Sequence, residues 1–267
     1  MAAEKRKGAR SAKDITPEIQ QQLNSGSIET ANLTEWLAVD QRILLGHLLS
    51  DNQRTAYLQP VLHRIDLLKK QTINTINEAI GTGLSEQAQQ HGDPELLRIM
   101  AHHPADLIRC WATYTIGKND GLTIAEALEG IQPFAADKHF GVREIAWLSL
   151  RAKLTRHLEE SISILTGWTQ HEDENIRRFA TESTRPRGVW CEHIDILKQN
   201  PAMALPLLEP LKSDPARYVQ DSVGNWLNDA SKTQPDFVTD LCRRWEEESD
   251  TKATRYILKK ALRTLQK

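Results

Sequence analysis

The feature that most constrains the fold is a helical motif that returns along the chain at similar intervals. Four segments carry it: HHPADLIRCWATYTIG, DKHFGVREIAWLSLRA, HEDENIRRFATEST and KSDPARYVQDSVGNWLND. Each begins with a turn of Asp, His, Pro or Gly, continues with a β-branched residue, and places a small or apolar residue four positions later. The β-branched anchors are Ile108, Val142, Ile176 and Val219, at intervals of 34, 34 and 43 residues, and Ile257 anchors a weaker copy.

The motif predicts a stack of helices in which no single unit is stable alone. Residues four apart lie on one face of an α-helix, and the turn residues cap the helix by accepting free backbone N–H groups. A helix pair with one apolar face needs a neighbour to cover it, as in a helical solenoid. Because β-branched alternation is nearly absent, we predict an all-α fold: a HEAT-like helical repeat solenoid that forms one domain over residues 14–267.

A basic residue follows three of the anchors directly: Arg109, Arg143 and Arg177. If the repeats stack in register, these arginines form a column of cations along one face. Alternatively, each arginine pairs with a carboxylate of an adjacent turn and only keeps the stack soluble, which is the more common case for an arbitrary helical repeat. The sequence leaves both interpretations open.

Composition excludes several classes of protein. The 267-residue chain has a formal net charge of −2, unlike a protein that coats nucleic acid without selectivity. No run approaches the roughly 20 apolar residues of a membrane span. Three distant cysteines indicate reduced thiols, and the dispersed histidines and the glycine pattern predict neither a metal site nor a cofactor.

The first 13 residues form a basic arm that we expect to be flexible. Its charges are Lys5, Arg6, Lys7, Arg10 and Lys13, and no apolar segment of a signal peptide follows them. We therefore expect a cytoplasmic protein. The arm could follow a DNA groove, although a solvated tail is the expected state without DNA.

The stretch TESTRPRGVW combines an acid, two arginines and a tryptophan in ten residues. Pro186 disfavours helix at the residue before it, so Arg185 and Arg187 lie on a stiff turn. A guanidinium group can donate two parallel hydrogen bonds to the oxygens of one phosphate. Two more arginines, Arg177 and Arg178, lie only a few residues earlier. The four arginines together suggest a clamp for a DNA backbone.

Each remaining polar or aromatic residue of this region has a structural and a functional interpretation. Glu182 is either the salt-bridge partner of the arginines or a carboxylate that stabilises positive charge on a sugar. Trp190 is either a core residue or an aromatic face for a base or deoxyribose. In DSVGNWLNDASK, Asn225, Asn228 and Asp229 lie at helical spacing on adjoining parts of one face.

With these motifs, the chain resembles the AlkC/AlkD superfamily of DNA alkylation-repair glycosylases over about residues 98–245, and is more similar to the AlkC branch. The resemblance implies a solenoid whose concave basic face binds duplex DNA. It also implies excision of positively charged N-alkylated purines, such as 3-methyladenine or 7-methylguanine, without flipping the base into a pocket. The partner is then duplex DNA with alkylated bases, bound by a monomer that associates with the nucleoid and needs no protein partner.

The resemblance also implies roles for particular residues. The positions that look catalytic are Glu182, Trp190 and Asp229. Those that look like DNA contacts are Arg143, Arg177, Arg178, Arg185, Arg187, Asn225 and Asn228. Where the AlkC branch has another acid, this chain has His139, and we expect Glu144 or Trp147 to take over that role if His139 does not.

Two further function classes stay open. A non-catalytic HEAT-repeat protein that binds damaged or branched DNA would use the same arginines without releasing a base, and His139 in place of an acid favours that class. A protein-binding HEAT scaffold would instead present an exposed apolar ridge.

Overall fold

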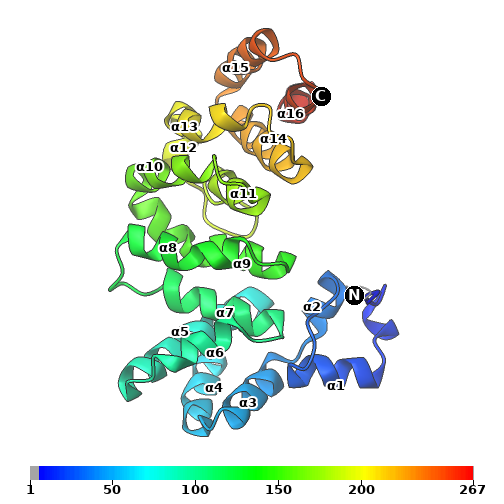
Figure 1. Ribbon diagram of the computed structural model, residues 1–267, viewed down its shortest axis with the longest axis vertical. Helices are drawn as coiled ribbons and strands as arrows, with labels where there is room; N and C mark the ends of the chain where they lie inside the picture. The colour runs from blue at the N-terminus through cyan, green and yellow to red at the C-terminus, as the bar shows by residue number, and fades with distance from the viewer. Residues whose placement is uncertain (1–5, 267) are drawn as a thin grey trace. The chain divides into compact units, whose positions relative to one another are not determined.

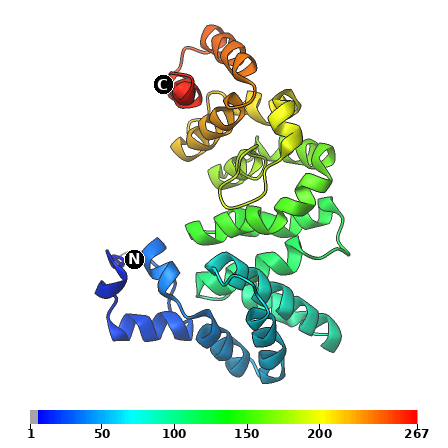
Figure 2. The same ribbon diagram turned by 180° about the vertical axis from the view of Figure 1, so that it is seen from behind.

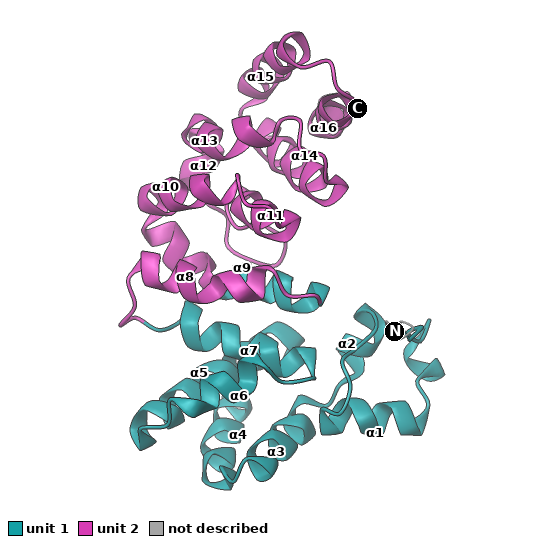
Figure 3. Ribbon diagram, viewed as in Figure 1, with its two compact units in different colours: residues 1–119, 139–149 teal, residues 120–138, 150–267 magenta. Residues whose placement is uncertain are grey.

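Helices make up all the regular secondary structure of residues 6–266, the part of the chain that the computed structural model describes (Figure 1). The predicted all-α, HEAT-like class is therefore confirmed. Within this part, the residues divide into two compact units, which are considered separately (Figure 3). Unit 1 comprises residues 6–119 and 139–149, and unit 2 comprises residues 120–138 and 150–266. No helix in the described ranges is long and apolar enough to cross a membrane.

Unit 1 is built around α5, which packs against both α4 and α7. Two further pairs complete it, α1 with α3 and α6 with α7. Its helices are α1 (Pro17–Ser25), α2 (Leu33–Ala38), α3 (Gln41–Asp51), α4 (Leu58–Asp66), α5 (Ile73–His91), α6 (Glu95–Ala101), α7 (Asp106–Gly117) and the first part of α9 (Phe140–Arg156).

Unit 2 is centred on α14, which packs against α11 on one side and α16 on the other (Figures 1 and 2). Its helices are α8 (Ile124–Ala135), the end of α9, α10 (Leu158–Trp168), α11 (Glu174–Glu182), α12 (Asp195–Gln199), α13 (Leu205–Leu208), α14 (Arg217–Ser231), α15 (Pro235–Glu248) and α16 (Lys252–Ala261). Short 3-10 turns lie at Ala12–Asp14, Thr55–Tyr57, Pro201–Ala204, Glu209–Leu211 and Leu262–Thr264.

The anchors of the sequence motif have the structural role that their spacing predicts. Ile108, Val142, Ile176 and Val219 are each the third residue of a helix, and none is more than 4% exposed. The residue four positions after each anchor is fully buried as well: Ala112, Ala146, Ala180 and Val223. Each pair therefore points into the core of its unit, where burial of apolar surface stabilises the helix.

A polar side chain directly after the anchor closes the turn that precedes the helix. In three repeats its nitrogen donates to the backbone carbonyl groups six and five positions earlier. The donors are Arg109 (2.8 and 2.8 Å), Arg177 (2.8 and 2.9 Å) and Gln220 (2.8 and 3.4 Å). We call this arrangement the turn clasp, and it satisfies carbonyl groups that would otherwise lack a partner next to a helix end.

The same turns are closed from their other side by an acceptor. His103, His171 and Asp214 each accept the backbone N–H group two residues later, at 3.0, 2.9 and 2.8 Å. Arg109 also pairs with Glu29 at 3.3 Å, and Arg177 pairs with Asp214 at 2.6 Å. For these two arginines, pairing within the stack is the observed arrangement rather than an open column of cations.

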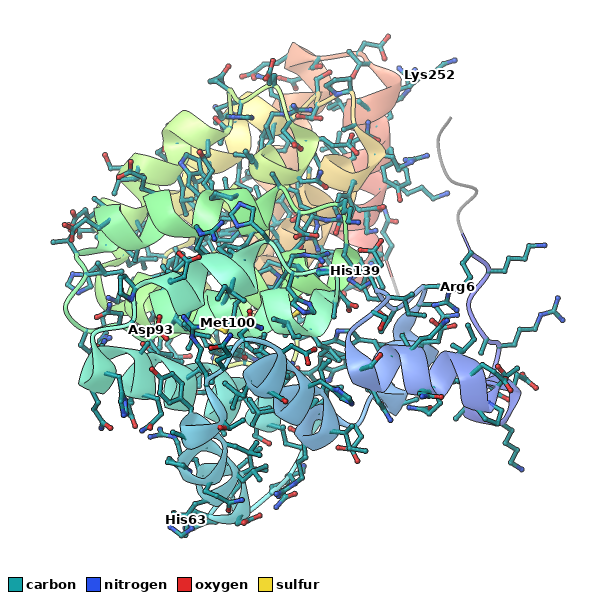
Figure 4. The ribbon with its side chains drawn as sticks, turned by 60° about the horizontal axis from the view of Figure 1, so that its bottom comes forward. Arg6, His63, Asp93, Met100, His139 and Lys252 are labelled. Atoms are coloured by element: carbon teal, nitrogen blue, oxygen red, sulfur yellow. The ribbon has the colours of Figure 1, made fainter. Side chains whose placement is uncertain are left out.

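The basic arm begins outside the described residues, and the part that follows is attached to unit 1. The Arg6 guanidinium donates to both carboxylate oxygens of Glu35 at 2.7 and 2.5 Å (Figure 4). The backbone N–H groups of Ala9 and Ala31 donate to the same carboxylate, which is 1% exposed. Burial alone would raise the pKa of Glu35, but these donors hold it below its usual range. Flexibility of the arm stays a prediction.

The turn clasp predicts unequal effects of two substitutions at Arg109. Arg109→Met removes both hydrogen bonds to the turn and should lower the free energy of unfolding by about 1 to 3 kcal/mol. Arg109→Gln should recover at least half of that loss, because Gln220 closes the equivalent turn with an amide. Urea unfolding followed by circular dichroism measures both. Equal losses would show that the pair with Glu29, and not the clasp, matters at this position.

Candidate functional site

The candidate site begins where α11 ends. Pro186 cannot donate to a helical ladder and disfavours helix at Arg185, so the chain leaves α11 after Glu182. Residues 183–194 form a loop before α12. Glu182 and Arg185, one turn apart, thus lie at the end of α11, where α14 packs against it.

Arg185 joins two buried carboxylates that come from different helices. Its Nη1 atom donates to Oε1 of Glu182 at 2.8 Å, while Nε and Nη2 donate to Oδ2 of Asp229 at 2.9 and 2.7 Å. Glu182 is 5% exposed, Asp229 3% and Arg185 9%. The predicted catalytic acids therefore meet on one guanidinium, which we call the carboxylate bridge.

Neighbouring side chains complete the hydrogen bonds of the two carboxylates. Ser222 Oγ donates to Oε2 of Glu182 at 2.8 Å, and Arg178 Nη2 lies 3.6 Å from the same oxygen. Lys232 Nζ donates to Oδ1 of Asp229 at 3.2 Å. The Arg178 guanidinium also lies over the ring of Tyr218, 4.1 Å from its centre. Both acids are thus held in place by more than one donor.

The electrostatics keep the bridge charged. Burial raises the pKa of Glu182, but the positive charges of Arg178 and Arg185 outweigh it and hold that pKa below its usual range. Burial likewise lowers the pKa of Arg185, whereas Glu182 and Asp229 raise it, and the result lies above its usual value. Ionised carboxylates are the form needed to stabilise a cationic sugar.

The loop after α11 presents an aromatic side chain to solvent. Trp190 is 79% exposed and has a φ of 59°, in the left-handed region that a bulky residue rarely adopts. Its neighbour Val189 is 51% exposed. Arg187 is half-buried, and within the described chain its buried Nε atom has no hydrogen-bond partner. Strained, exposed aromatic residues of this kind are typical of binding loops.

The two asparagines predicted beside Asp229 differ in their surroundings. Asn225 is half-buried on α14, whereas Asn228 is 2% exposed and accepts a hydrogen bond from Thr264 at 2.9 Å. Asn228 is thus occupied within the fold. Arg177 is occupied in the same way by the turn clasp and Asp214. Contact of these three residues with DNA stays a prediction.

The remaining candidates belong to unit 1. His139 is buried, with Nε2 2.8 Å from the backbone oxygen of Thr30 and Nδ1 accepting the N–H group of Gly141 at 3.1 Å (Figure 4). Trp147 is buried and donates to Glu144 Oε2 at 2.9 Å. Arg143 is half-buried at the start of α9. These bonds give His139 and Trp147 structural partners, and a helper role for them stays a prediction.

Sequence reasoning missed several residues that support the site. On α14, helical spacing aligns Tyr218, Ser222 and Asp229 at intervals of four and seven, so this signal was available in the sequence. Lys232, three residues after Asp229, was available in the same way. Arg151 of α9, which binds the loop that carries Trp190, lies far away in the sequence and has no such signal.

Residues 6–266 contain no group of three or more His, Cys, Asp or Glu side chains that could hold a metal ion.

Comparisons with known proteins place the chain beside proteins of DNA alkylation repair. Residues 142–265 match the family described as DNA alkylation repair enzyme. An uncharacterised protein of Bacillus subtilis, YhaZ, is 37% identical over 139 residues, which are 52% of this chain and 38% of that protein. This match agrees with the predicted resemblance to DNA alkylation-repair proteins over the part of the chain that it covers.

Two solved structures share the fold. The alkylpurine DNA glycosylase AlkC of Pseudomonas fluorescens, bound to DNA with an abasic-site analogue, gives a TM-score of 0.68 at 19% identity, over 97% of this chain and 66% of that one. AlkD2 of Streptococcus mutans gives a TM-score of 0.60 at 22% identity, over 77% of this chain and 97% of that one.

The carboxylate bridge predicts how stability depends on pH. A carboxyl group with a lowered pKa stabilises the fold above its unfolded pKa of about 4.3, and this contribution is lost as the pH falls through the folded pKa. Near pH 7, Glu182→Gln should lower the free energy of unfolding by about 1 to 3 kcal/mol. The difference from wild type should shrink as the pH drops below about 4. Denaturant unfolding at a series of pH values measures it, and a constant difference would contradict the assignment.

Proposed function

We propose, from the match of residues 142–265 to the family described as DNA alkylation repair enzyme, that this chain is a DNA glycosylase. Its substrates are positively charged N-alkylated purines of the 3-methyladenine and 7-methylguanine class in duplex DNA. The observation that carries the proposal is the carboxylate bridge, in which Glu182 and Asp229 meet on Arg185 below a loop that exposes Trp190.

The main contribution of the protein to this reaction is to stabilise the positive charge that develops on the sugar. The bond between C1′ of the deoxyribose and the purine nitrogen breaks, and its electron pair leaves with the base, whose positive charge is thereby neutralised. Positive charge develops on the sugar, and a water molecule adds to C1′ and loses a proton. Glu182 and Asp229 stabilise that sugar cation, and the face of Trp190 does so through its π electrons.

The buried carboxylates become available when DNA takes over their arginine. In the free protein both acids are less than a tenth exposed and Arg185 occupies one oxygen of each. Phosphate oxygens accept the same forked donors as a carboxylate does. We infer that a backbone phosphate next to the lesion draws Arg185 away and leaves Glu182 and Asp229 facing the sugar.

The exposed position of Trp190 supports excision without base flipping. An enzyme that extrudes a base encloses it between side chains in a pocket. Trp190 instead presents its ring at the surface of a loop. This arrangement suits contact with a lesion that remains stacked in the duplex. We propose alkylated duplex DNA as the partner. The chain would bind it as a monomer, in the cytoplasm at the nucleoid.

One observation favours a second candidate function, non-catalytic binding of damaged or branched DNA. The cations Arg178, Arg185 and Lys232 neutralise both carboxylates in the free protein, so the cluster also suits a purely structural role. His139, in the position of a family acid, is occupied by Thr30 and Gly141. In this case the arginines hold phosphates and no glycosidic bond breaks.

Release of free base separates the two functions. Wild-type protein should release methylated purines from methylated duplex DNA, and Glu182→Gln or Asp229→Asn should slow this at least about a hundredfold, the usual effect of losing one charge-stabilising group. Mass spectrometry of the released bases under single-turnover conditions is the measurement.

The control is Glu159→Gln, which changes an exposed carboxylate of α10 and should leave the rate unchanged. Circular dichroism must show that all variants are folded. No release by the folded wild type, with DNA still bound, would replace the glycosylase with the non-catalytic function.

Binding should depend on salt in proportion to the phosphates held. Arg187→Ala removes a half-buried guanidinium from the loop without unpairing either acid. The plot of log affinity against log salt concentration has a negative slope, and the substitution should make this slope less steep by about 1. Fluorescence anisotropy with a duplex at several salt concentrations measures the slope. Arg243→Ala, an exposed arginine of α15, is the matched control. An unchanged slope for Arg187→Ala would remove Arg187 from the DNA contacts.

A further inference from the structure

We propose that Arg151 is a positioning residue of the site, which holds both ends of the loop 183–192 so that Arg185, Arg187 and Trp190 are presented in one conformation. The inference deepens the proposed function and rests on it for its effect on catalysis. Arg151 lies on the part of α9 that belongs to unit 2, together with the loop. It acts on DNA only through the loop.

Within residues 6–266, the Arg151 guanidinium donates its hydrogen bonds to backbone carbonyl groups. Nη1 donates to Ser183 at 2.8 Å and Nη2 donates to Arg185 at 2.6 Å, where the loop leaves α11. Nη2 and Nε donate to Glu192 at 3.1 and 3.3 Å, where the loop returns. One planar group therefore ties the two ends of the loop together. We call Arg151 with these three carbonyl acceptors, Ser183, Arg185 and Glu192, the clamp.

The requirement for an arginine follows from the chemistry of these acceptors. The carbonyl groups of Ser183 and Arg185 directly follow the C-terminus of α11, the negative end of its dipole, where a cation is stabilising. Arg151 is 4% exposed and, within residues 6–266, its hydrogen bonds are to carbonyl oxygens rather than to a carboxylate. Lysine offers one nitrogen on a flexible stem and cannot reach both ends of the loop in this planar geometry.

Other contacts show that the loop has little freedom once its ends are tied. The N–H group of Ile194 donates to the carbonyl oxygen of Pro186 at 3.1 Å. A Cβ atom at Gly188 would lie 2.4 Å from Sγ of Cys191 and 3.3 Å from Nη2 of Arg151. The left-handed backbone of Trp190 is a strained conformation, and such strain persists only where the surroundings impose it. Arg151 supplies that constraint.

The clamp also explains how Arg185 exchanges partners without disturbing the loop. Its carbonyl oxygen is held by Arg151 while its side chain binds Glu182 and Asp229. The backbone at residue 185 is fixed, so transfer of the guanidinium to a phosphate needs only side-chain rotation. Trp190 and Arg187 then stay in place during the exchange.

The test compares Arg151→Met with Arg156→Met, the same change at an exposed arginine one and a half turns later on α9. Two properties are measured: single-turnover release of methylated purines at saturating protein, and amide hydrogen exchange of peptides that cover residues 183–194. We expect Arg151→Met to slow release about tenfold or more, since small misplacements of reacting groups are costly, and to speed exchange in the loop. Arg156→Met should change neither.

A double variant shows whether the effect passes through Trp190. If Arg151 acts by placing this side chain, adding Arg151→Met to a Trp190→Ala variant should have little further effect. The double variant should release base less than about threefold more slowly than Trp190→Ala alone. Effects that multiply in full would overturn the placement of Trp190 by Arg151, and unchanged exchange in the loop of Arg151→Met would overturn the positioning role as a whole. If Arg151→Met does not fold, Arg151→Lys takes its place and should lie between wild type and the Met variant's expected values.

The outcomes also separate this inference from the proposed function. If wild-type protein releases no base, the glycosylase assignment fails. Faster loop exchange in Arg151→Met, with weaker binding of a methylated duplex, would then still support the positioning role. Unchanged exchange and unchanged binding would overturn it.

Discussion

The structure depends on donors for the carbonyl groups in the turns between its short helices. A stack of many helices has many turns, and the carbonyl oxygens of a turn have no partner in a helical ladder. Where a turn is buried, side chains replace water as donors to these oxygens. Arg109, Arg177 and Gln220 close the turns before three repeat helices, and Arg151 binds the loop after α11. The repeat is thus maintained by side-chain donors as well as by its apolar anchors.

The candidate site lies after α11, where a side chain also donates to backbone carbonyl groups. After α11 the chain turns at Pro186, and Arg151 donates to the carbonyl groups of Ser183 and Arg185, so the side chain of Arg185 is not used for them. It is free to join Glu182 to Asp229 across the contact between α11 and α14. Ser222 and Lys232 occupy further oxygens of the acids. The packing of α11 against α14 therefore brings Arg185, Glu182 and Asp229 together in one cluster.

Local patterns in the sequence predicted what depends on local geometry. Anchors such as Ile108 and Val219 follow helical spacing, and they begin helices with buried faces as expected. The chemistry of Glu182 and Asp229 followed from their residue types and from family resemblance. Their joint pairing with Arg185 did not, because it depends on which helices pack together. For the same reason the turn that Arg177 closes was not predicted, and Arg151, far from the loop in sequence, was not identified.

The carboxylate bridge has a consequence for the way a nucleic acid reaches this surface. Two unpaired acids would repel the phosphate backbone during diffusional approach and slow association. With Arg185 between them, and with Arg178 and Lys232 beside them, the negative charges of Glu182 and Asp229 are cancelled at a distance. In the proposed function, the field that an approaching duplex meets is then set by the cations around the cluster. Repulsion would arise only once a phosphate binds Arg185, so association with DNA and stabilisation of the sugar cation require opposite charges at different times.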